Sequence, residues 1–115
     1  MIPLFVCHAN CSRSMIAAYL FRDIAGAPAL SAGMEAGEWP AARAVEMLAY
    51  WGVDASAHRP RQVDRAVCDQ AGAIFVMAAP YLCRLLIEYG EDLAIKSYLF
   101  ADPFGPCALP TASTP

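Results

Sequence analysis

Basic side chains are scarce in this 115-residue chain, which has 8 lysines and arginines against 11 aspartates and glutamates. The net charge of -3 and the pI near 5.2 argue against a general nucleic-acid-binding protein, because such proteins usually carry a basic stripe. Long apolar runs are missing too: the longest are strand-sized, well short of the ~20 residues that a membrane helix needs. We therefore expect neither a nucleic-acid partner nor a membrane partner.

The cysteine pattern lacks the features of a disulfide framework or a zinc site. The chain has 5 cysteines, an odd number, and no two of them are spaced as CxxC. Secreted disulfide scaffolds use even numbers of cysteines, and structural zinc sites use closely spaced pairs. We therefore expect reduced thiols, no bound metal and a cytoplasmic location. The apolar run from Met1 to Val6 is too short for a secretion signal and has no basic segment before it.

A hydrophobic content of 58% against 17% charged residues predicts one folded domain with a substantial core. Strand-like and helix-like segments alternate along it. Such alternation predicts an α/β fold, in which a four-stranded parallel sheet is flanked by helices on both faces. We expect strands at Ile2–Val6, Ala29–Ala32, Ala73–Met77 and Ala94–Phe100, and helices at Ser14–Ala25, Pro40 to Tyr50 or Trp51, Val63–Gln70 and Pro80–Tyr89.

Ligands of parallel α/β sheets bind at the carboxyl ends of the strands, so the segment after the first strand is the first candidate site. This segment reads Cys7-His8-Ala9-Asn10-Cys11-Ser12-Arg13-Ser14, and a helix follows it. A loop that curls into a helix N-terminus directs successive N–H groups inward, which favours an oxyanion. Arg13 could hold two oxygens of that anion, and the same positive field favours Cys7 as a thiolate nucleophile.

Single residues of this loop also have simpler interpretations. A lone cysteine is usually a small buried hydrophobe, Ser14 could only cap the helix, and Arg13 could be a surface residue. The strand before the loop, the helix after it and the serine that follows Arg13 favour the anion site. In that site the Ser14 hydroxyl could donate a hydrogen bond to the Cys7 sulfur, and Asn10 suits a left-handed kink.

These residues resemble the low-molecular-weight protein tyrosine phosphatase family, which has the loop C-x-x-N-x-x-R-S after its first strand. The resemblance extends from Ile2 to about Phe100. It includes the segments Ser31-Ala32-Gly33, Arg43–Leu48, Gly52-Val53-Asp54, His58–Gln62 and Ile74–Met77.

The resemblance implies hydrolysis of a phosphotyrosine-type phosphomonoester in two steps, without a cofactor. Cys7 would form a phosphocysteine, and an aspartic acid would first protonate the leaving oxygen and later activate water. Arg13 and the loop amides would hold the phosphate, so no metal is needed. The implied partners are a phosphorylated protein or a small phosphomonoester, and inorganic phosphate or a similar oxyanion. The phosphate-binding set is His8, Ala9, Asn10, Cys11, Ser12, Arg13 and Ser14.

Three positions of the loop depart from the commonest family pattern. Ala9 stands where glycine is usual, which narrows the allowed backbone conformations. Ser12 takes the usual place of a second cysteine, and Cys11 lies one residue earlier, which puts a protective disulfide with Cys7 in question. His8 is unusual beside the substrate, where it could either add a positive charge at mildly acidic pH or only face solvent.

The general acid of the family lies in an Asp-Pro dipeptide, and here the candidate is Asp102-Pro103, with Phe104 as a pocket wall. Asp102 comes only two residues after the expected end of the fourth strand, whereas several residues separate them in the family. A turn at the strand end is the alternative. We expect a domain over residues 1–102 and a loose Pro-rich tail over 103–115. The long final helix of the family has no counterpart here, which would expose one apolar face of the sheet.

Other residues have mostly structural interpretations at this stage. Trp39 could flank the mouth of the site, but packing in the core or at a helix start is favoured. Tyr50, Trp51, Cys68 and Cys83 are expected in the core, while His58 and Arg61 are expected to brace a loop. An arsenate reductase of the same fold is disfavoured, because Cys83 and Cys107 are far apart in sequence. A degenerate relative that binds an oxyanion but turns over poorly remains the main alternative.

Overall fold

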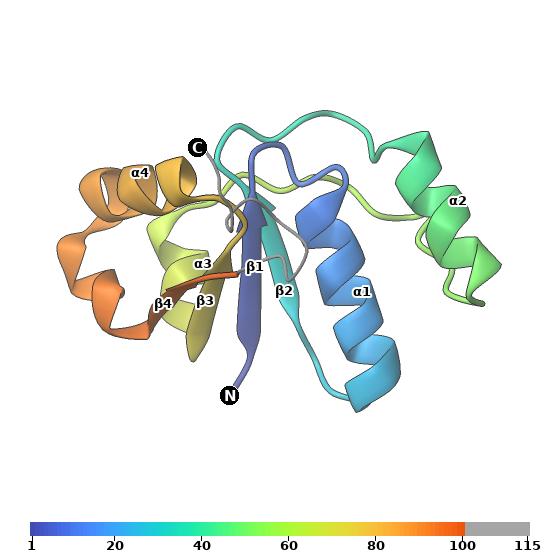
Figure 1. Cartoon of the computed structure of the whole chain (residues 1–115), viewed down its shortest axis with the longest axis horizontal. Coiled ribbons are helices and arrows are strands. Elements are labelled where there is room, and N and C mark those ends of the chain that lie inside the picture. Colours follow the sequence, from blue (N-terminus) through green and yellow to red (C-terminus); the bar gives the residue numbers. More distant parts are fainter. Residues whose placement is uncertain (101–115) are drawn as a thin grey trace, which may run out of the picture.

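Four parallel strands form the sheet, in the order β2-β1-β3-β4. The structure is a computed structural model that describes residues 1–100, and Figure 1 shows its strands at the centre. The expectations about Asp102, Phe104, Cys107 and the tail lie outside the described residues. The strands are β1 (Pro3–Cys7), β2 (Leu30–Gly33), β3 (Ala73–Val76) and β4 (Ser97–Leu99).

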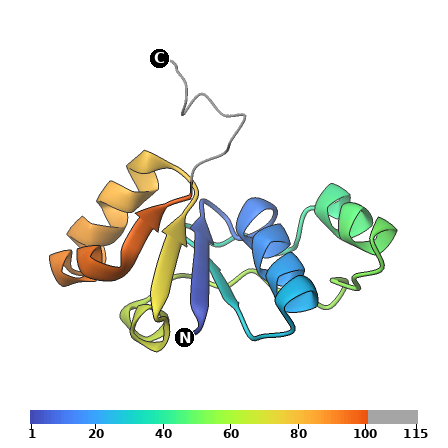
Figure 2. The ribbon, with the colours of Figure 1, turned by 60° about the horizontal axis from the view of Figure 1, so that its bottom comes forward.

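Helices cover both faces of this sheet. They are α1 (Arg13–Ala25), α2 (Ala42–Tyr50), α3 (Arg65–Gln70) and α4 (Ala79–Tyr89), with a 3-10 helix η1 (Glu91–Lys96) before β4. Helix α1 packs on one face and carries α2 on its outer side, whereas α3, α4 and η1 pack on the other face. Figure 2 shows the four strands side by side between these two groups. No helix within residues 1–100 is both long and apolar enough to span a membrane.

The first strand is buried along its whole length, as a central strand of a parallel sheet should be. Its side chains alternate between two cores. Leu4 and Val6 join the larger core with α3 and α4, and Phe5 joins the smaller core with Ala18 of α1. The predicted α/β class, the four parallel strands and the flanking helices are therefore confirmed.

The fourth strand is shorter than predicted. The prediction of a strand over Ala94–Phe100 is wrong at its start, because residues 91–96 form the 3-10 helix η1. In this turn Leu93 is buried, while Ile95 is 88% exposed. The Ser97 hydroxyl donates to the Leu93 carbonyl at 2.7 Å, and the Lys96 ammonium donates to the Ala71 carbonyl at 2.7 Å. These bonds fix a helical turn where hydrophobic content alone suggested an extended chain.

Three residues predicted in the core are exposed. Tyr50 and Trp51, at the end of α2, are 86% and 55% exposed, because α2 buries only Ala44 and Leu48. Cys83 on α4 is also exposed, whereas Cys68 on α3 is fully buried as predicted. The spacing of apolar residues along a short helix shows which side is apolar, but not how much of that side other elements cover.

One face of the sheet carries an open apolar groove. The aromatic rings of Phe5 and Phe75 stack at 5.6 Å between centroids, and Tyr98 continues the row at 5.6 Å from Phe75. Tyr98 is 52% exposed. Within residues 1–100, α1 covers only part of this face and leaves the groove open. The groove has a volume of about 430 Å³ and is lined by Phe5, Ala17, Leu20, Phe21, Ile24, Ala25 and Phe100.

Candidate active site

The loop between β1 and α1 turns all its carbonyl groups outward. Each carbonyl oxygen from Cys7 to Ser12 accepts a hydrogen bond of 2.7–3.0 Å from outside the ring that the loop forms. Because the N–H of a trans peptide points opposite to its C=O, the amide N–H groups of this loop point inward. The donors, in order, are the backbone N–H groups of Met34, Glu35 and Gly37, His58 Nε2, and the N–H groups of Ala41 and Ile16.

The segment from Met34 to Ala41, between β2 and α2, therefore lies alongside the loop. Figure 1 shows the two side by side above the sheet. Gly33 permits this approach, since a Cβ there would lie 2.7 Å from the Ala9 carbonyl carbon. Gln62 fixes the same segment with two bonds, one to the Met34 carbonyl at 2.8 Å and one from the Ala36 N–H at 2.9 Å. Sequence reasoning matched Ser31-Ala32-Gly33 and Gln62 to the family but missed this role.

The Cys7 sulfur lies inside the loop, and Cys7 as a whole is 5% exposed. Ser14 Oγ is 2.9 Å from this sulfur, and the Asn10 N–H donates to it at 3.3 Å. Ser14 Oγ also accepts a bond from Asn10 Nδ2 at 2.9 Å, so its own proton is free to donate to the sulfur. Two donors therefore point at the sulfur that the sequence predicted as the nucleophile. The predicted contact between Ser14 and Cys7 is confirmed.

Asn10 is the centre of the network that holds the loop. It is fully buried and has a positive φ of 59°, so the predicted left-handed kink is confirmed. Its side-chain oxygen accepts the Arg61 N–H at 2.8 Å, and its carbonyl accepts His58 Nε2 at 3.0 Å. A carbonyl has no proton, so the His58 tautomer must carry hydrogen on Nε2. His58 and Arg61 thus brace the loop as predicted, although Arg61 does so with its backbone.

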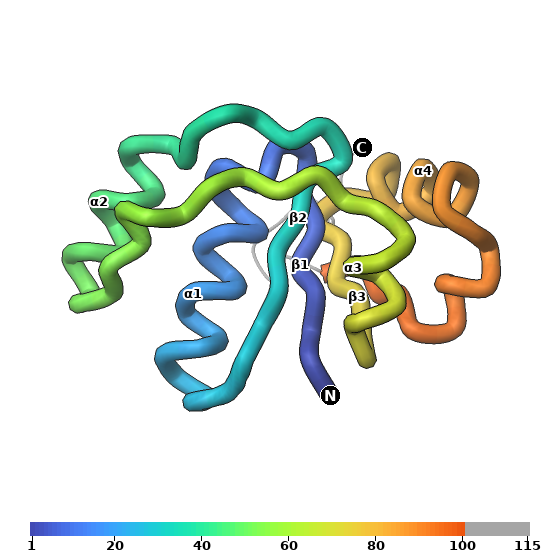
Figure 3. Tube along the Cα trace, turned by 180° about the vertical axis from the view of Figure 1, so that it is seen from behind, coloured from blue at the N-terminus to red at the C-terminus, as the bar shows by residue number. Residues whose placement is uncertain are grey.

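Figure 3, which views the molecule from behind, shows the segment between α2 and α3, which contains these bracing residues, crossing in front of the strands. The His58 ring is 8% exposed and packs edge-on against Tyr19 of α1, with 5.6 Å between centroids. The loop is therefore held from two sides, by this segment and by residues 34–41.

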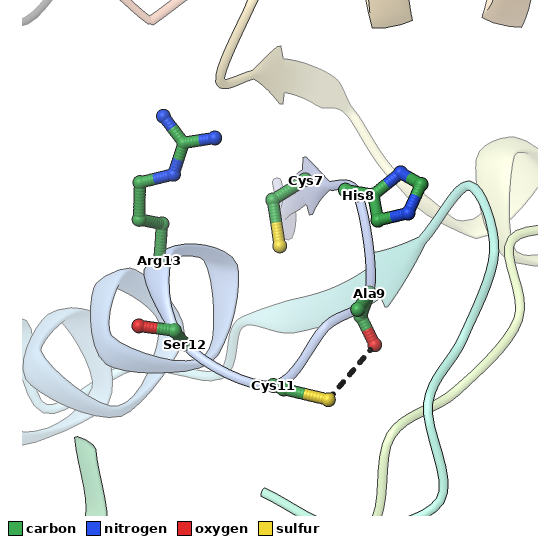
Figure 4. Close-up of a pocket in the computed structure, with 6 residues that line it drawn as sticks. All are labelled: Cys7, His8, Ala9, Cys11, Ser12 and Arg13. Carbon is green, nitrogen blue, oxygen red and sulfur yellow. Dashed lines mark hydrogen bonds between the residues drawn. The ribbon is translucent and has the colours of Figure 1, made fainter. Parts of the chain in front are cut away.

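The inner side of the loop is an open pocket of about 170 Å³. This volume is several times the ~30 Å³ that one water occupies. Arg13 is the first residue of α1 and is exposed. Figure 4 shows its side chain on one side of the Cys7 sulfur and His8 on the other. The pocket is lined by Cys7, His8, Ala9, Cys11, Ser12 and Arg13.

Trp39 does not pack in the core or at a helix start, as sequence reasoning favoured, because it is 64% exposed. The Arg59 guanidinium lies over its ring, 4.7 Å from the centroid. Trp39 follows Gly37, whose N–H donates to the Ala9 carbonyl at 3.0 Å. The exposed indole is therefore two residues away from a direct contact with the loop.

The remaining thiols differ in environment. The Cys11 thiol donates to the Ala9 carbonyl at 3.4 Å and does not point towards Cys7 (Figure 4). Burial raises the pKa of the Cys68 thiol, with a smaller opposing effect of Lys96. Cys7, Cys11, Cys68 and Cys83 are all free. Within residues 1–100, no group of three or more His, Cys, Asp or Glu side chains could hold a metal ion.

Comparison with known proteins places this loop in a family. The model of the family described as low molecular weight phosphotyrosine protein phosphatase matches residues 3–100. No curated protein sequence matches the chain.

Solved structures agree with this match. The YwlE arginine phosphatase from Geobacillus stearothermophilus is 27% identical with a TM-score of 0.78, and the match covers 90% of this chain and 76% of that one. A low molecular weight protein tyrosine phosphatase from T. tengcongensis is 29% identical with a TM-score of 0.74, covering 91% and 83%. The tyrosine phosphatase Wzb from Escherichia coli K30, in complex with sulphate, shares the fold at 23% identity with a TM-score of 0.77, covering 90% and 80%.

These matches do not favour the arsenate reductase alternative, and Cys7 stands at the start of the phosphate loop after β1. The chain belongs to the low molecular weight phosphotyrosine protein phosphatase family and is a hydrolase of phosphoesters that works through a cysteine nucleophile.

Proposed function

We propose that Cys7 is the nucleophile and that the loop from His8 to Ser14 binds the phosphoryl group of a phosphotyrosine-type monoester. The outward direction of every carbonyl from Cys7 to Ser12 carries this proposal, because it turns the N–H groups inward, where those other than the N–H of Asn10 can bind a ligand with three oxygens. Arg13 adds a full positive charge at the rim. Its guanidinium is suited to two oxygens of a phosphate.

In the first step the Cys7 thiolate attacks phosphorus, and the bond from phosphorus to the leaving oxygen breaks. The loop amides and Arg13 stabilise the charge that develops on the equatorial oxygens. In the second step water attacks the phosphocysteine, which releases inorganic phosphate and restores the thiolate. The donors from Ser14 and Asn10 to the sulfur make Cys7 a better leaving group in this second step.

Asp102 remains our candidate for the acid that protonates the leaving oxygen in the first step and activates water in the second. The support for it is the Asp-Pro dipeptide, which follows β4 in the sequence, and the carboxyl end of β4 lies at the same edge of the sheet as the phosphate loop. Phe104 would line the pocket for an aryl group. An Asp102→Asn variant should lose ~10²–10⁴-fold in kcat.

We also propose a substrate class and a compartment. The 170 Å³ pocket is open to one side, which suits a phosphate on a side chain of a phosphoprotein or on a small molecule. The relatives named above include an arginine phosphatase and tyrosine phosphatases, so phosphoarginine is the competing substrate. Thiols stay reduced in the cytoplasm, which suits a cysteine nucleophile, and we therefore propose a cytoplasmic location.

Hydrolysis of p-nitrophenyl phosphate and of a phosphotyrosine peptide tests the proposal, with a phosphoarginine peptide in parallel. The full chain should release phosphate, Cys7→Ser should release none, and acid quench should trap a phosphocysteine on the wild type. Cys83→Ser is the matched control, since Cys83 is exposed on α4 and should not matter. A wild type that binds phosphate but hydrolyses none of the three substrates would establish the oxyanion-binding alternative instead.

A further inference from the structure

His8 has a fixed backbone and a side chain at the pocket. Its carbonyl accepts the Glu35 N–H at 2.7 Å, and the preceding carbonyl of Cys7 accepts the Met34 N–H at 3.0 Å. Both peptide groups are therefore held against the segment after β2. The His8 side chain is exposed, and it lines the pocket next to the nucleophile. A ring at this place meets whatever group carries the phosphate.

The ring of Tyr81, on α4, contacts the His8 ring. It lies in the first turn of α4, directly after the carboxyl end of β3, and is half-buried against the larger core. The centroids of the two rings are 5.6 Å apart, with 34° between their planes. Such contacts restrict the rotation of an exposed imidazole. Figure 4 shows the His8 ring across the Cys7 sulfur from Arg13, so the pocket has a second nitrogen-bearing wall.

Within residues 1–100, the charged groups near this wall pair with one another and not with the imidazole. From the loop itself, Cys7 and Arg13 face the pocket. Glu35 follows β2, and its carboxylate pairs with Arg84 of α4 at 3.5 Å. Arg84 also pairs with Glu88 at 3.1 Å, so the two carboxylates share one guanidinium. Within residues 1–100, no carboxylate is hydrogen-bonded to the His8 ring. Tyr81 is a further titratable group on that side.

We propose that His8, held against Tyr81, is a specificity-determining residue that selects phosphoesters with a carboxylate beside the phosphate-bearing group. This inference rests on the proposed function and names its substrate class. Histidine is the side chain that gains a positive charge between neutral and mildly acidic pH. A protonated imidazole at the wall attracts a neighbouring carboxylate, and a neutral one does not. Because the pair is partly exposed, we expect a preference of about two- to fivefold.

Two phosphotyrosine peptides that differ only in a Glu or a Gln directly before the phosphotyrosine test this inference. The ratio of their kcat/KM values cancels the titration of the phosphate, of Cys7 and of the general acid. For the full chain the ratio should be about two to five at pH 5.5 and near one at pH 8.0. His8→Gln should give a ratio near one at both pH values. Tyr81→Phe should keep the wild-type ratios, and Tyr81→Ala should lower the ratio at pH 5.5.

Arg43→Gln is the control, because it removes an exposed, non-titrating positive charge on α2 and leaves the pairs of Arg84 with Glu35 and Glu88 in place. It should leave the pH dependence of the ratio intact. A ratio that is equal at both pH values in the wild type, or unchanged in His8→Gln, would overturn the role of His8 while leaving the phosphatase function in place. If the wild type hydrolyses neither peptide, the proposed function fails and the role of His8 fails with it.

Discussion

The side-chain nitrogen of Asn10 lies 2.9 Å from Ser14 Oγ, and this contact decides the direction of the hydrogen bond that Ser14 makes. An amide nitrogen can only donate, so Ser14 Oγ accepts here and must use its single proton elsewhere. The Cys7 sulfur, 2.9 Å away, is the receiving atom. The side chain of a buried asparagine thus orients a hydroxyl towards the nucleophile.

Replacing Ser14 by alanine should therefore impair both chemistry and thiolate reactivity. The variant loses one donor to the sulfur and leaves Asn10 Nδ2 without an acceptor in a buried site. A hydrogen bond to a charged group contributes about 1.5–3 kcal/mol, so kcat should fall roughly 10–100-fold. Alkylation of Cys7 by iodoacetamide at pH 6 should slow as well. A Ser14→Ala protein with unchanged alkylation and turnover would show that the sulfur does not depend on this hydroxyl.

Asn10→Asp separates the two uses of the Asn10 side chain. Aspartate keeps the oxygen that accepts the Arg61 N–H but cannot donate to Ser14. We expect a folded protein with a large loss of kcat, because the carboxylate also places a negative charge beside the thiolate and the phosphate. Asn10→Ala loses both hydrogen bonds. It also puts alanine, which tolerates the left-handed region less well than asparagine, at a φ of 59°.

The comparison is made by urea unfolding and p-nitrophenyl phosphate turnover of both variants. Asn10→Ala should lose about 2–4 kcal/mol of stability, and Asn10→Asp less. Equal stability of the two variants would contradict the importance of the bond to Arg61.

Gly33→Ala tests the close approach of β2 to the phosphate loop. A Cβ at this position would lie 2.7 Å from the Ala9 carbonyl carbon and 2.8 Å from the Asn10 nitrogen, and neither backbone atom can move freely. We expect kcat/KM to fall more than tenfold with a stability loss of about 1–3 kcal/mol. Gly26→Ala is the matched control: it strains a φ of 63° at the end of α1 but touches nothing within 4 Å. It should destabilise the protein without changing kcat/KM of the folded fraction.

The sequence predicted the loop well because its signals are local. The order of strand, Cys7, Arg13 and helix puts N–H groups, thiol and guanidinium together whatever the rest of the chain does. Asn10 was recognised from its backbone preference, and Ser14 from its place beside Arg13. These residues act within eight positions of one another, so spacing alone determines their arrangement.

The errors concern contacts between distant segments. No element within residues 1–100 covers the side of α2 where Tyr50 and Trp51 lie. The spacing of apolar residues along the helix cannot show this. Residues 34–41 hold the loop through backbone hydrogen bonds. Such bonds do not depend on the side chains, so the sequence gives little sign of them. Gly33 was the one visible signal, and only the structure shows that it permits the approach of Ala9. The η1 turn before β4 likewise depends on Ser97 and Lys96 reaching carbonyls elsewhere.

Cys68 should make the stability of the protein depend on pH in the alkaline range. Burial raises the pKa of this thiol, so the folded state keeps its proton where the unfolded chain, with an ordinary thiol near pH 8.5, loses it. The unfolded state then binds fewer protons than the folded state, and stability falls as the pH rises above about 8.5. Urea unfolding at pH 7.5 and pH 9.5 should show that the free energy of unfolding falls less in Cys68→Ala than in the wild type. Cys83→Ala should fall as the wild type does, because Cys83 is exposed. An equal fall in the wild type and Cys68→Ala would mean that the buried thiol ionises as readily in the folded protein as in the unfolded chain.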